Sequence, residues 1–250
     1  MFVDALSQTL PPDWVDAAVM RAKDKIAPAE GVRYTAAVDA SGGGPAAFTF
    51  AVVHVEGEGE ARKVVQDVMR GWSRKGSEAP DLVDIVKDIA ATLKSYGLDE
   101  VTGDKYGGAW VTQAFRDAGV TYRAAALDAS EAYVECQPLF AREAIAILDH
   151  PVLVRELKAL EQRALPSGKV KIDAPRREND DHANALALIA ALAVGEGGEG
   201  LKILNVLMGN PKISVDEQQR MQDEDDERAR EISSEAIERV CKSNGVWWPR

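Results

Sequence analysis

Aspartates occupy three positions in this 250-residue chain from which their carboxylates could hold metal ions. Asp39 ends the run Tyr-Thr-Ala-Ala-Val, Asp104 follows Val-Thr-Gly, and the pair Asp180-Asp181 precedes a run of alanines and leucines. Carboxylate oxygens are the ligands that Mg²⁺ and Mn²⁺ prefer. Two such ions about 3.5–4 Å apart can align a water with a phosphodiester bond and offset the charge of the phosphate. The three segments therefore predict phosphodiester hydrolysis, provided that the fold brings them together.

Each of these aspartates also has an ordinary structural interpretation. Asp39 stands before Ser-Gly-Gly-Gly and could be a turn residue, whereas Asp104 could cap the helix that follows it. Asp180 and Asp181 could cap their own helix, because a helix N-terminus favours negative charge. His182 is interpreted either as a surface residue at the start of that helix or as a group that assists a metal-bound water or the leaving group. The order of the segments and their positions at the ends of elements favour the metal site.

The composition favours a site built from carboxylates. Cys136 and Cys241 are isolated, and His54, His150 and His182 are too scattered for a zinc cluster.

The net charge of −11 argues against indiscriminate binding of nucleic acid. With 46% hydrophobic residues, the chain can form one large domain or a domain with an appendage. It has no apolar run of about 18 residues and no signal-like N-terminus, which predicts a soluble protein inside the cell.

Two stretches carry a net positive charge, unlike the chain as a whole. Residues 61–76 hold five basic residues against one acidic residue, and residues 155–177 hold seven against three. Each stretch is either an ordinary solvated face or a rim that contacts phosphates beside the acidic centre. The candidate DNA contacts are Lys105, Arg74, Lys75, Lys169, Lys171, Arg176 and Arg177.

The elements that must position the aspartates follow from periodicity and turn residues. Strands are predicted over 33–39, 46–55 and 63–72, joined by short turns as an antiparallel meander. Helices and strands then alternate: a helix from Pro80 to the glycine at 97, a strand over 100–103, a helix over 108–118, a strand over 120–126, helices over 130–148 and 151–165, a strand over 169–173, and a helix over 180–193. In the helix over 108–118, Trp110, Val111, Ala114 and Phe115 are predicted to face inward. This alternation predicts an α/β fold with parallel pairing.

Changes in composition suggest three parts of the chain. Residues 1–30, with three prolines and a short helical pattern over 13–26, are predicted to be a linker. Residues 31–195 are predicted to form the nuclease domain. Residues 196–250 begin with a glycine-rich break and are predicted to be a flexible, charged helical tail with too few apolar positions for a core of its own.

Four segments resemble the C-terminal nuclease domain of the large terminase subunit of tailed double-stranded DNA bacteriophages. They are Val38-Asp-Ala-Ser-Gly-Gly-Gly, Phe48-Thr-Phe-Ala-Val, Gly103-Asp-Lys-Tyr-Gly-Gly and Asn179-Asp-Asp-His-Ala-Asn-Ala-Leu, and the resemblance runs from about residue 34 to residue 193. It implies a ribonuclease H-like α/β fold, in which a mixed sheet of the three-stranded antiparallel meander and parallel strands is flanked by helices. It also implies a nuclease that uses two Mg²⁺ or Mn²⁺ ions and cuts concatemeric viral DNA to start and finish packaging.

The resemblance carries over to single residues. Asp39 matches the first-strand ligand that bridges the two ions, and Asp104 matches the second acidic ligand. Asp181, with Asp180 beside it, matches the acidic pair at the last helix, and either of the two could be the main ligand. Residues 169–177 fall where such domains carry a hairpin near the DNA. The implied reaction is in-line attack by a metal-bound water, without a covalent intermediate.

A complete large terminase also has an N-terminal ATPase, and no Gly-x-x-x-x-Gly-Lys-Ser/Thr motif occurs in this chain. We therefore expect a separated domain, a product of a split gene or a truncated remnant. The implied partners are double-stranded DNA, a terminase ATPase domain, the portal and the small terminase subunit, in the cytoplasm of a bacterial host and without a membrane. Two alternatives stay open: another ribonuclease H-like nuclease, such as a junction resolvase or an RNA–DNA hybrid nuclease, and a non-catalytic module that docks to a packaging or portal partner.

Overall fold

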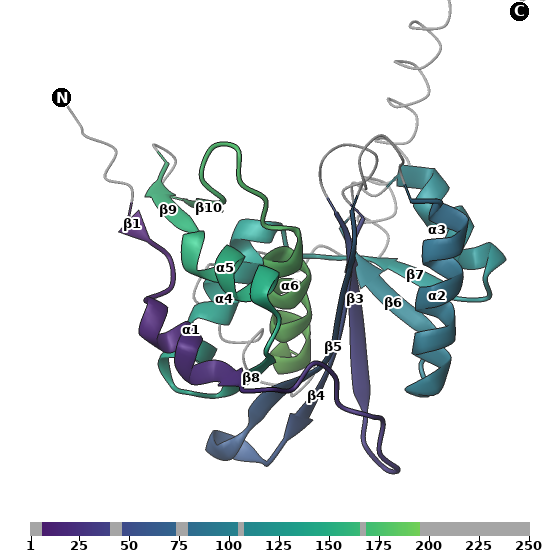
Figure 1. Cartoon of the computed structure of the whole chain (residues 1–250), viewed down its shortest axis with the longest axis horizontal. Helices are drawn as coiled ribbons and strands as arrows, with labels where there is room; N and C mark the ends of the chain where they lie inside the picture. The colour runs from purple at the N-terminus through teal and green to yellow at the C-terminus, as the bar shows by residue number, and fades with distance from the viewer. Residues whose placement is uncertain (1–6, 41–46, 74–79, 105–107, 166–168, 196–250) are drawn as a thin grey trace, which may run out of the picture. The chain divides into compact units, whose positions relative to one another are not determined.

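The computed structural model describes residues 7–40, 47–73, 80–104, 108–165 and 169–195. Within these ranges, seven strands form one sheet in the order β2-β8-β5-β4-β3-β6-β7, with helices packed on both faces (Figure 1). A second, three-stranded sheet has the order β1-β9-β10. None of the helices in this part of the chain is long and apolar enough to cross a membrane.

The predicted antiparallel meander forms the centre of the large sheet. It consists of β3 (Tyr34–Asp39), β4 (Phe48–Glu56) and β5 (Lys63–Trp72), each paired antiparallel with the next. Both faces of these strands are covered. Most of their residues are apolar, and the buried polar exceptions include Thr49, Gln66 and Asp67.

Parallel strands extend the meander on both sides. β6 (Glu100–Gly103) pairs with β3, and β7 (Thr121–Ala124) pairs with β6. On the other side, β8 (Ile145–Leu148) pairs with β5, and the short β2 (Val19–Met20) pairs with β8. The sheet is therefore mixed, as the sequence predicts.

The sheet separates two apolar cores. On one face lie α2 (Leu82–Ser95) and α3 (Gly108–Asp117), which pack against Phe50 and Val52 of β4. On the other lie α4 (Ala129–Ala141), α5 (Pro151–Ala159) and α6 (Asp181–Gly195). α6 is apolar almost all round because it is enclosed by β3, β4, α4 and α5 (Figure 1).

Two predicted helices end earlier than expected. The helix predicted over 130–148 stops at Ala141, where Glu143 takes a positive φ of 55°, and the buried run Ile-Ala-Ile-Leu becomes β8. The helix predicted over 151–165 stops at Ala159. The residues after it form β9 (Glu161–Ala164), which pairs antiparallel with β10 (Val170–Asp173). In both cases strand pairing overrides local helical preference.

The first described residues contribute to the core. The helical pattern over 13–26 yields only α1 (Pro12–Ala18), which is followed by β2, while β1 (Ser7–Gln8) pairs with β9. Leu10 and Val15 are buried in the same core as α6. The predicted divisions at residues 30 and 195 stay predictions. The predicted glycine turn at 42–45 and the predicted tail over 196–250 lie outside the described residues.

The predicted inward orientation of Trp110 is wrong. Val111 and Phe115 of α3 are fully buried, but Trp110 is 47% exposed. Trp110 directly precedes Val111 on the helix, so it points about 100° away from the face that Val111 and Phe115 share.

Candidate functional site

The strands that carry the aspartates end at one edge of the sheet. Asp39 is the last residue of β3 and lies opposite Thr49 of β4, which in turn lies opposite Gly71 of β5. β6 runs parallel to β3 with Val38 opposite Gly103, and Asp104 directly follows that pair. Asp39 and Asp104 therefore emerge from neighbouring strands at the same edge.

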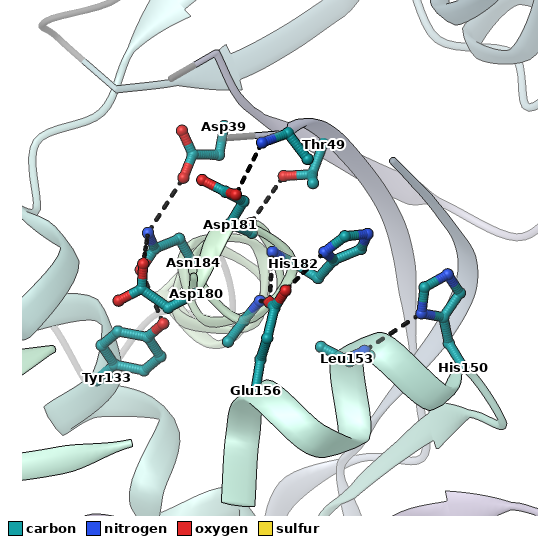
Figure 2. Close-up of polar contacts among 12 residues, drawn as sticks. Asp39, Thr49, Tyr133, His150, Leu153, Glu156, Asp180, Asp181, His182 and Asn184 are labelled. Carbon is teal, nitrogen blue, oxygen red and sulfur yellow. Dashed lines mark hydrogen bonds and ion pairs between the residues drawn. The ribbon is translucent and has the colours of Figure 1, made fainter. Parts of the chain in front are cut away.

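The first turn of α6 lies beside Asp39 and Thr49 (Figure 2). The Thr49 hydroxyl donates to the backbone oxygen of Asp181 at 2.7 Å, and the Ala47 backbone N–H donates to the Asp181 carboxylate at 2.8 Å. Asp181 is only 5% exposed. Contacts to β4 and to the residue that precedes it thus fix both the start of α6 and the Asp181 side chain.

Asn184 joins two of the predicted ligands. Its Nδ2 donates to Asp39 Oδ2 at 3.1 Å and to Asp180 Oδ1 at 3.2 Å. The hydroxyl of the buried Tyr133, on α4, donates to the Asn184 Oδ1 at 2.7 Å (Figure 2). Neither Asn184 nor Tyr133 was predicted from the sequence to be a site residue. The available signal for Asn184 was its spacing, four residues after Asp180 and therefore on the same side of the helix.

Asp104 is exposed, and its backbone is anchored by Tyr122 of β7. The Tyr122 hydroxyl donates to the Asp104 carbonyl oxygen at 2.7 Å. A Cβ at Gly103 would lie 2.3 Å from the Tyr122 hydroxyl oxygen, so this contact requires glycine there. Burial raises the pKa of Tyr122, and the charges of Asp104 and Asp39 raise it further, which keeps the hydroxyl protonated as a donor.

Negative charge gathers around Asp180. Burial raises the pKa of Asp180, and the carboxylates of Asp181, Asp173 and Glu156 add to that rise, while the hydrogen bond from the Ala174 backbone N–H opposes it. That hydrogen bond to Asp180 Oδ2 measures 3.1 Å. A divalent cation would relieve the repulsion among such carboxylates.

The donor set fits a hard divalent cation in chemical type, since it consists of carboxylate oxygens. Nevertheless, across the described ranges, no three acidic, histidine or cysteine side chains converge into a ready-made ion cage. Between Asp39 and Asp180 stands the Asn184 amide, which donates to both.

His182 is not on the surface, where one of its two interpretations placed it. It is 7% exposed, and its Nδ1 lies 3.0 Å from Glu156 Oε1 on α5. Its Nε2 approaches β5 so closely that a Cβ at Gly71 would lie 2.3 Å away. His182 is therefore a buried packing residue between α5, α6 and β5.

The predicted DNA contacts are only partly described. Lys169 and Lys171 pair with acidic side chains, at 3.6 Å to Glu131 and 2.8 Å to Asp173. Arg176 and Arg177 are exposed in the segment between β10 and α6, close in sequence to Asp180. Lys105, Arg74 and Lys75 lie outside the described residues.

Comparison with known proteins gives a consistent structural likeness. No family model and no curated protein matches the chain. The large terminase nuclease of thermophilic phage G20c, solved with bound magnesium, matches 74% of this chain and 97% of its own, with a TM-score of 0.59 and 16% identity. The Thermus phage P74-26 large terminase nuclease domain matches 73% of this chain and 94% of its own, with a TM-score of 0.56 and 15% identity. The chain has the fold of a large terminase nuclease domain.

The chain spans less than half of one longer protein with a similar fold. The HK97 bacteriophage large terminase matches 77% of this chain with a TM-score of 0.61 and 13% identity, and the chain spans 45% of that protein. The likeness confirms the predicted ribonuclease H-like α/β class. The G20c nuclease was also solved with bound cobalt.

Proposed function

We propose that the chain is a metal-dependent endonuclease that cleaves double-stranded, concatemeric viral DNA during phage genome packaging. The observation that carries the proposal is the joining of Asp39 and Asp180 by Asn184, at the sheet edge from which Asp104 emerges. The fold supports it, because the similar proteins are large terminase nucleases, one solved with magnesium and with cobalt.

In this proposal Asp39, Asp104, Asp181 and Asp180 hold two Mg²⁺ or Mn²⁺ ions. The ions would supply an activated water and offset the charge of the phosphate. The protein's own part is to hold the carboxylates in position: Ala47 and Thr49 fix the first residue of α6, and Asn184 holds Asp39 against Asp180.

DNA would be contacted by the basic residues that border the acidic edge. Arg176 and Arg177 stand in the segment that leads to Asp180, and Lys169 and Lys171 lie on or next to β10. Lys105, Arg74 and Lys75 complete the proposed set. Residues 31–195 would act as the nuclease domain, with 1–30 as linker and 196–250 as tail, beside a terminase ATPase domain, the portal and the small terminase subunit in the host cytoplasm.

The test is incubation of the purified protein with supercoiled plasmid and Mn²⁺ or Mg²⁺. We expect metal-dependent nicking or linearisation, and a loss of at least about 100-fold in the Asp39→Asn variant, because a neutral amide is a poor ligand for these ions. Asp149→Asn, in which the exchanged carboxylate accepts a hydrogen bond from the Ala22 backbone and is not a proposed ligand, is the matched control and should cut normally. Undiminished cleavage by Asp39→Asn would remove that residue from the site.

A substrate panel distinguishes the other ribonuclease H-like activities. Cleavage confined to branched DNA would indicate a junction resolvase, and cleavage confined to RNA–DNA hybrids would indicate a hybrid nuclease. Linear and supercoiled duplexes of the same sequence provide the comparison.

One observation favours a second candidate, a non-catalytic module that docks to a packaging or portal partner. It is that the described acidic side chains do not form a ready-made ion cage. For such a module, Mn²⁺ would neither raise the melting temperature nor support cleavage, whereas a nuclease site that binds Mn²⁺ would be stabilised by it.

A further inference from the structure

Asp180 occupies the N-cap position of α6. Its backbone oxygen accepts a hydrogen bond from the Asn184 N–H at 2.7 Å, and the helix begins at the next residue. An aspartate at this position ordinarily turns its carboxylate onto the backbone N–H of the second or third helical residue. In α6 those residues are His182 and Ala183.

Both N–H groups instead donate to a carboxylate from another helix. Glu156 Oε2, on α5, accepts from His182 N at 2.8 Å and from Ala183 N at 3.0 Å. Glu156 Oε1 lies 3.0 Å from the His182 imidazole Nδ1, and the Glu156 side chain is almost fully buried (Figure 2). Glu156 thus supplies the side-chain cap that Asp180 would otherwise provide.

The consequence concerns the direction of the Asp180 carboxylate. Its Oδ1 accepts from the Asn184 side chain, which also donates to Asp39, and its Oδ2 accepts from the Ala174 backbone. The carboxylate therefore faces the acidic sheet edge and not the backbone N–H groups of its own helix. A single carboxylate could not satisfy the N–H groups of His182 and Ala183 and also make these contacts.

We propose that Glu156 is a positioning residue for the metal site: it caps α6 from α5 and so releases the Asp180 carboxylate to bind metal. The inference rests on the proposed function for the role of Asp180, but it concerns metal binding, which is measurable without DNA. This arrangement requires glycine at position 71, because a Cβ there would collide with the His182 ring that contacts Glu156.

The experiment measures Mn²⁺ binding to the full chain by the electron paramagnetic resonance signal of free Mn²⁺. Glu156→Met keeps the length of the side chain but removes both acceptors, and we expect Mn²⁺ affinity to fall about 10-fold or more, as for other residues that orient metal ligands. Glu156→Gln keeps one amide oxygen that can accept both backbone N–H groups, so most of the affinity should be restored.

Two controls separate this role from general destabilisation. Leu157→Val removes packing from the neighbouring, fully buried position of α5 and leaves the Glu156 contacts in place, so it should lower the melting temperature without changing Mn²⁺ affinity. When Asp180 is already replaced by alanine, adding Glu156→Met should lower the Mn²⁺ affinity by less than about two-fold relative to Asp180→Ala alone. The carboxylate that Glu156 releases is then already absent.

Each outcome is decisive. Equal Mn²⁺ affinity in the wild type and Glu156→Met would overturn the inference, as would equal losses in Glu156→Met and Glu156→Gln, or a wild-type protein that binds no Mn²⁺. Glu156-dependent Mn²⁺ binding without DNA cleavage would uphold the inference and refute the nuclease. DNA cleavage with Mn²⁺ binding that is independent of Glu156 would do the reverse.

Discussion

Asn184 donates from one nitrogen to Asp39 and Asp180, and its amide oxygen accepts the hydroxyl of Tyr133. This last contact determines which end of the amide faces the carboxylates, since a hydroxyl hydrogen directed at Asn184 leaves its NH₂ group pointing the other way. The geometry of the acidic edge therefore depends on a buried phenol that carries no charge and belongs to a different helix.

Tyr133→Phe tests this dependence at the scale of one atom. The change leaves the Asn184 oxygen without its donor, and we expect a loss of about 1–2 kcal/mol in the free energy of unfolding. We also expect Mn²⁺ affinity to fall several-fold, because the Asn184 amide is then free to turn. Chemical denaturation and Mn²⁺ titration are the measurements.

Tyr96→Phe is the matched control for that variant. Tyr96 belongs to the other core, and its hydroxyl donates to the Ile26 backbone oxygen. It should lower stability and leave Mn²⁺ affinity unchanged. A Tyr133→Phe variant with wild-type affinity would show that Asn184 keeps its orientation without the phenol.

Single residues also show where sequence analysis succeeds. Asp39 and Asp104 could be placed because each ends an apolar strand pattern, and neighbouring parallel strands end at the same edge. Glu156 could not be found in this way. Its partners lie 26 and 27 residues along the chain, and only the packing of α5 against α6 brings them together.

At the scale of elements, α5 begins with a histidine cap. His150 is the N-cap residue, and its Nδ1 accepts the Leu153 backbone N–H at 3.2 Å. The His182 ring lies 5.0 Å from the His150 ring, and Glu156 is also close enough to influence it. Burial lowers the pKa of His150 from 6.5, and the neighbouring His182 lowers it further, against the opposing effect of Glu156. The neutral ring that the cap requires is thus the favoured form in the folded protein.

This direction predicts how stability changes with pH. Because the pKa is lower in the folded state, the contribution of His150 is fully present above 6.5 and is lost as the pH falls through the lowered value. His150→Asn keeps a good N-cap residue that does not titrate in this range. We expect the melting temperature of the wild type to fall relative to that of His150→Asn as the pH is lowered from about 7.5 to 5.

A constant difference in melting temperature between these two proteins across that pH range would contradict the assignment of His150 as a neutral cap. The comparison of the two proteins cancels the pH dependence of the ionisable groups that do not interact with position 150, because only that position differs.

The strands show which elements could be predicted from the sequence and which could not. The meander was predictable because its long, largely apolar segments are separated by short glycine-containing sequences. β8 and β9 were missed because each is four residues long and follows a helix without a proline or glycine between them. Their pairing with β5 and β10 supplies the stabilisation that local preference lacks.

At the scale of the whole molecule, the described residues form one compact body with an apolar core on each side of the sheet. Contacts divide the chain after Gly200. We therefore expect a chain shortened to residues 1–200 to melt in one cooperative transition, within a few degrees of the full chain, and to retain Mn²⁺ affinity. Differential scanning calorimetry measures this, and a broad or missing transition would show that residues 201–250 are required for folding.

The enclosure of α6 affects how the site moves. The backbone N–H groups inside this helix are shielded by β3, β4, α4 and α5, so they can exchange with deuterium mainly when much of the domain opens. Asp181 and Asn184 belong to the first turn of that helix. The acidic edge is thus attached to a helix that opens only together with much of the domain, and an arriving ion would find this helix already formed.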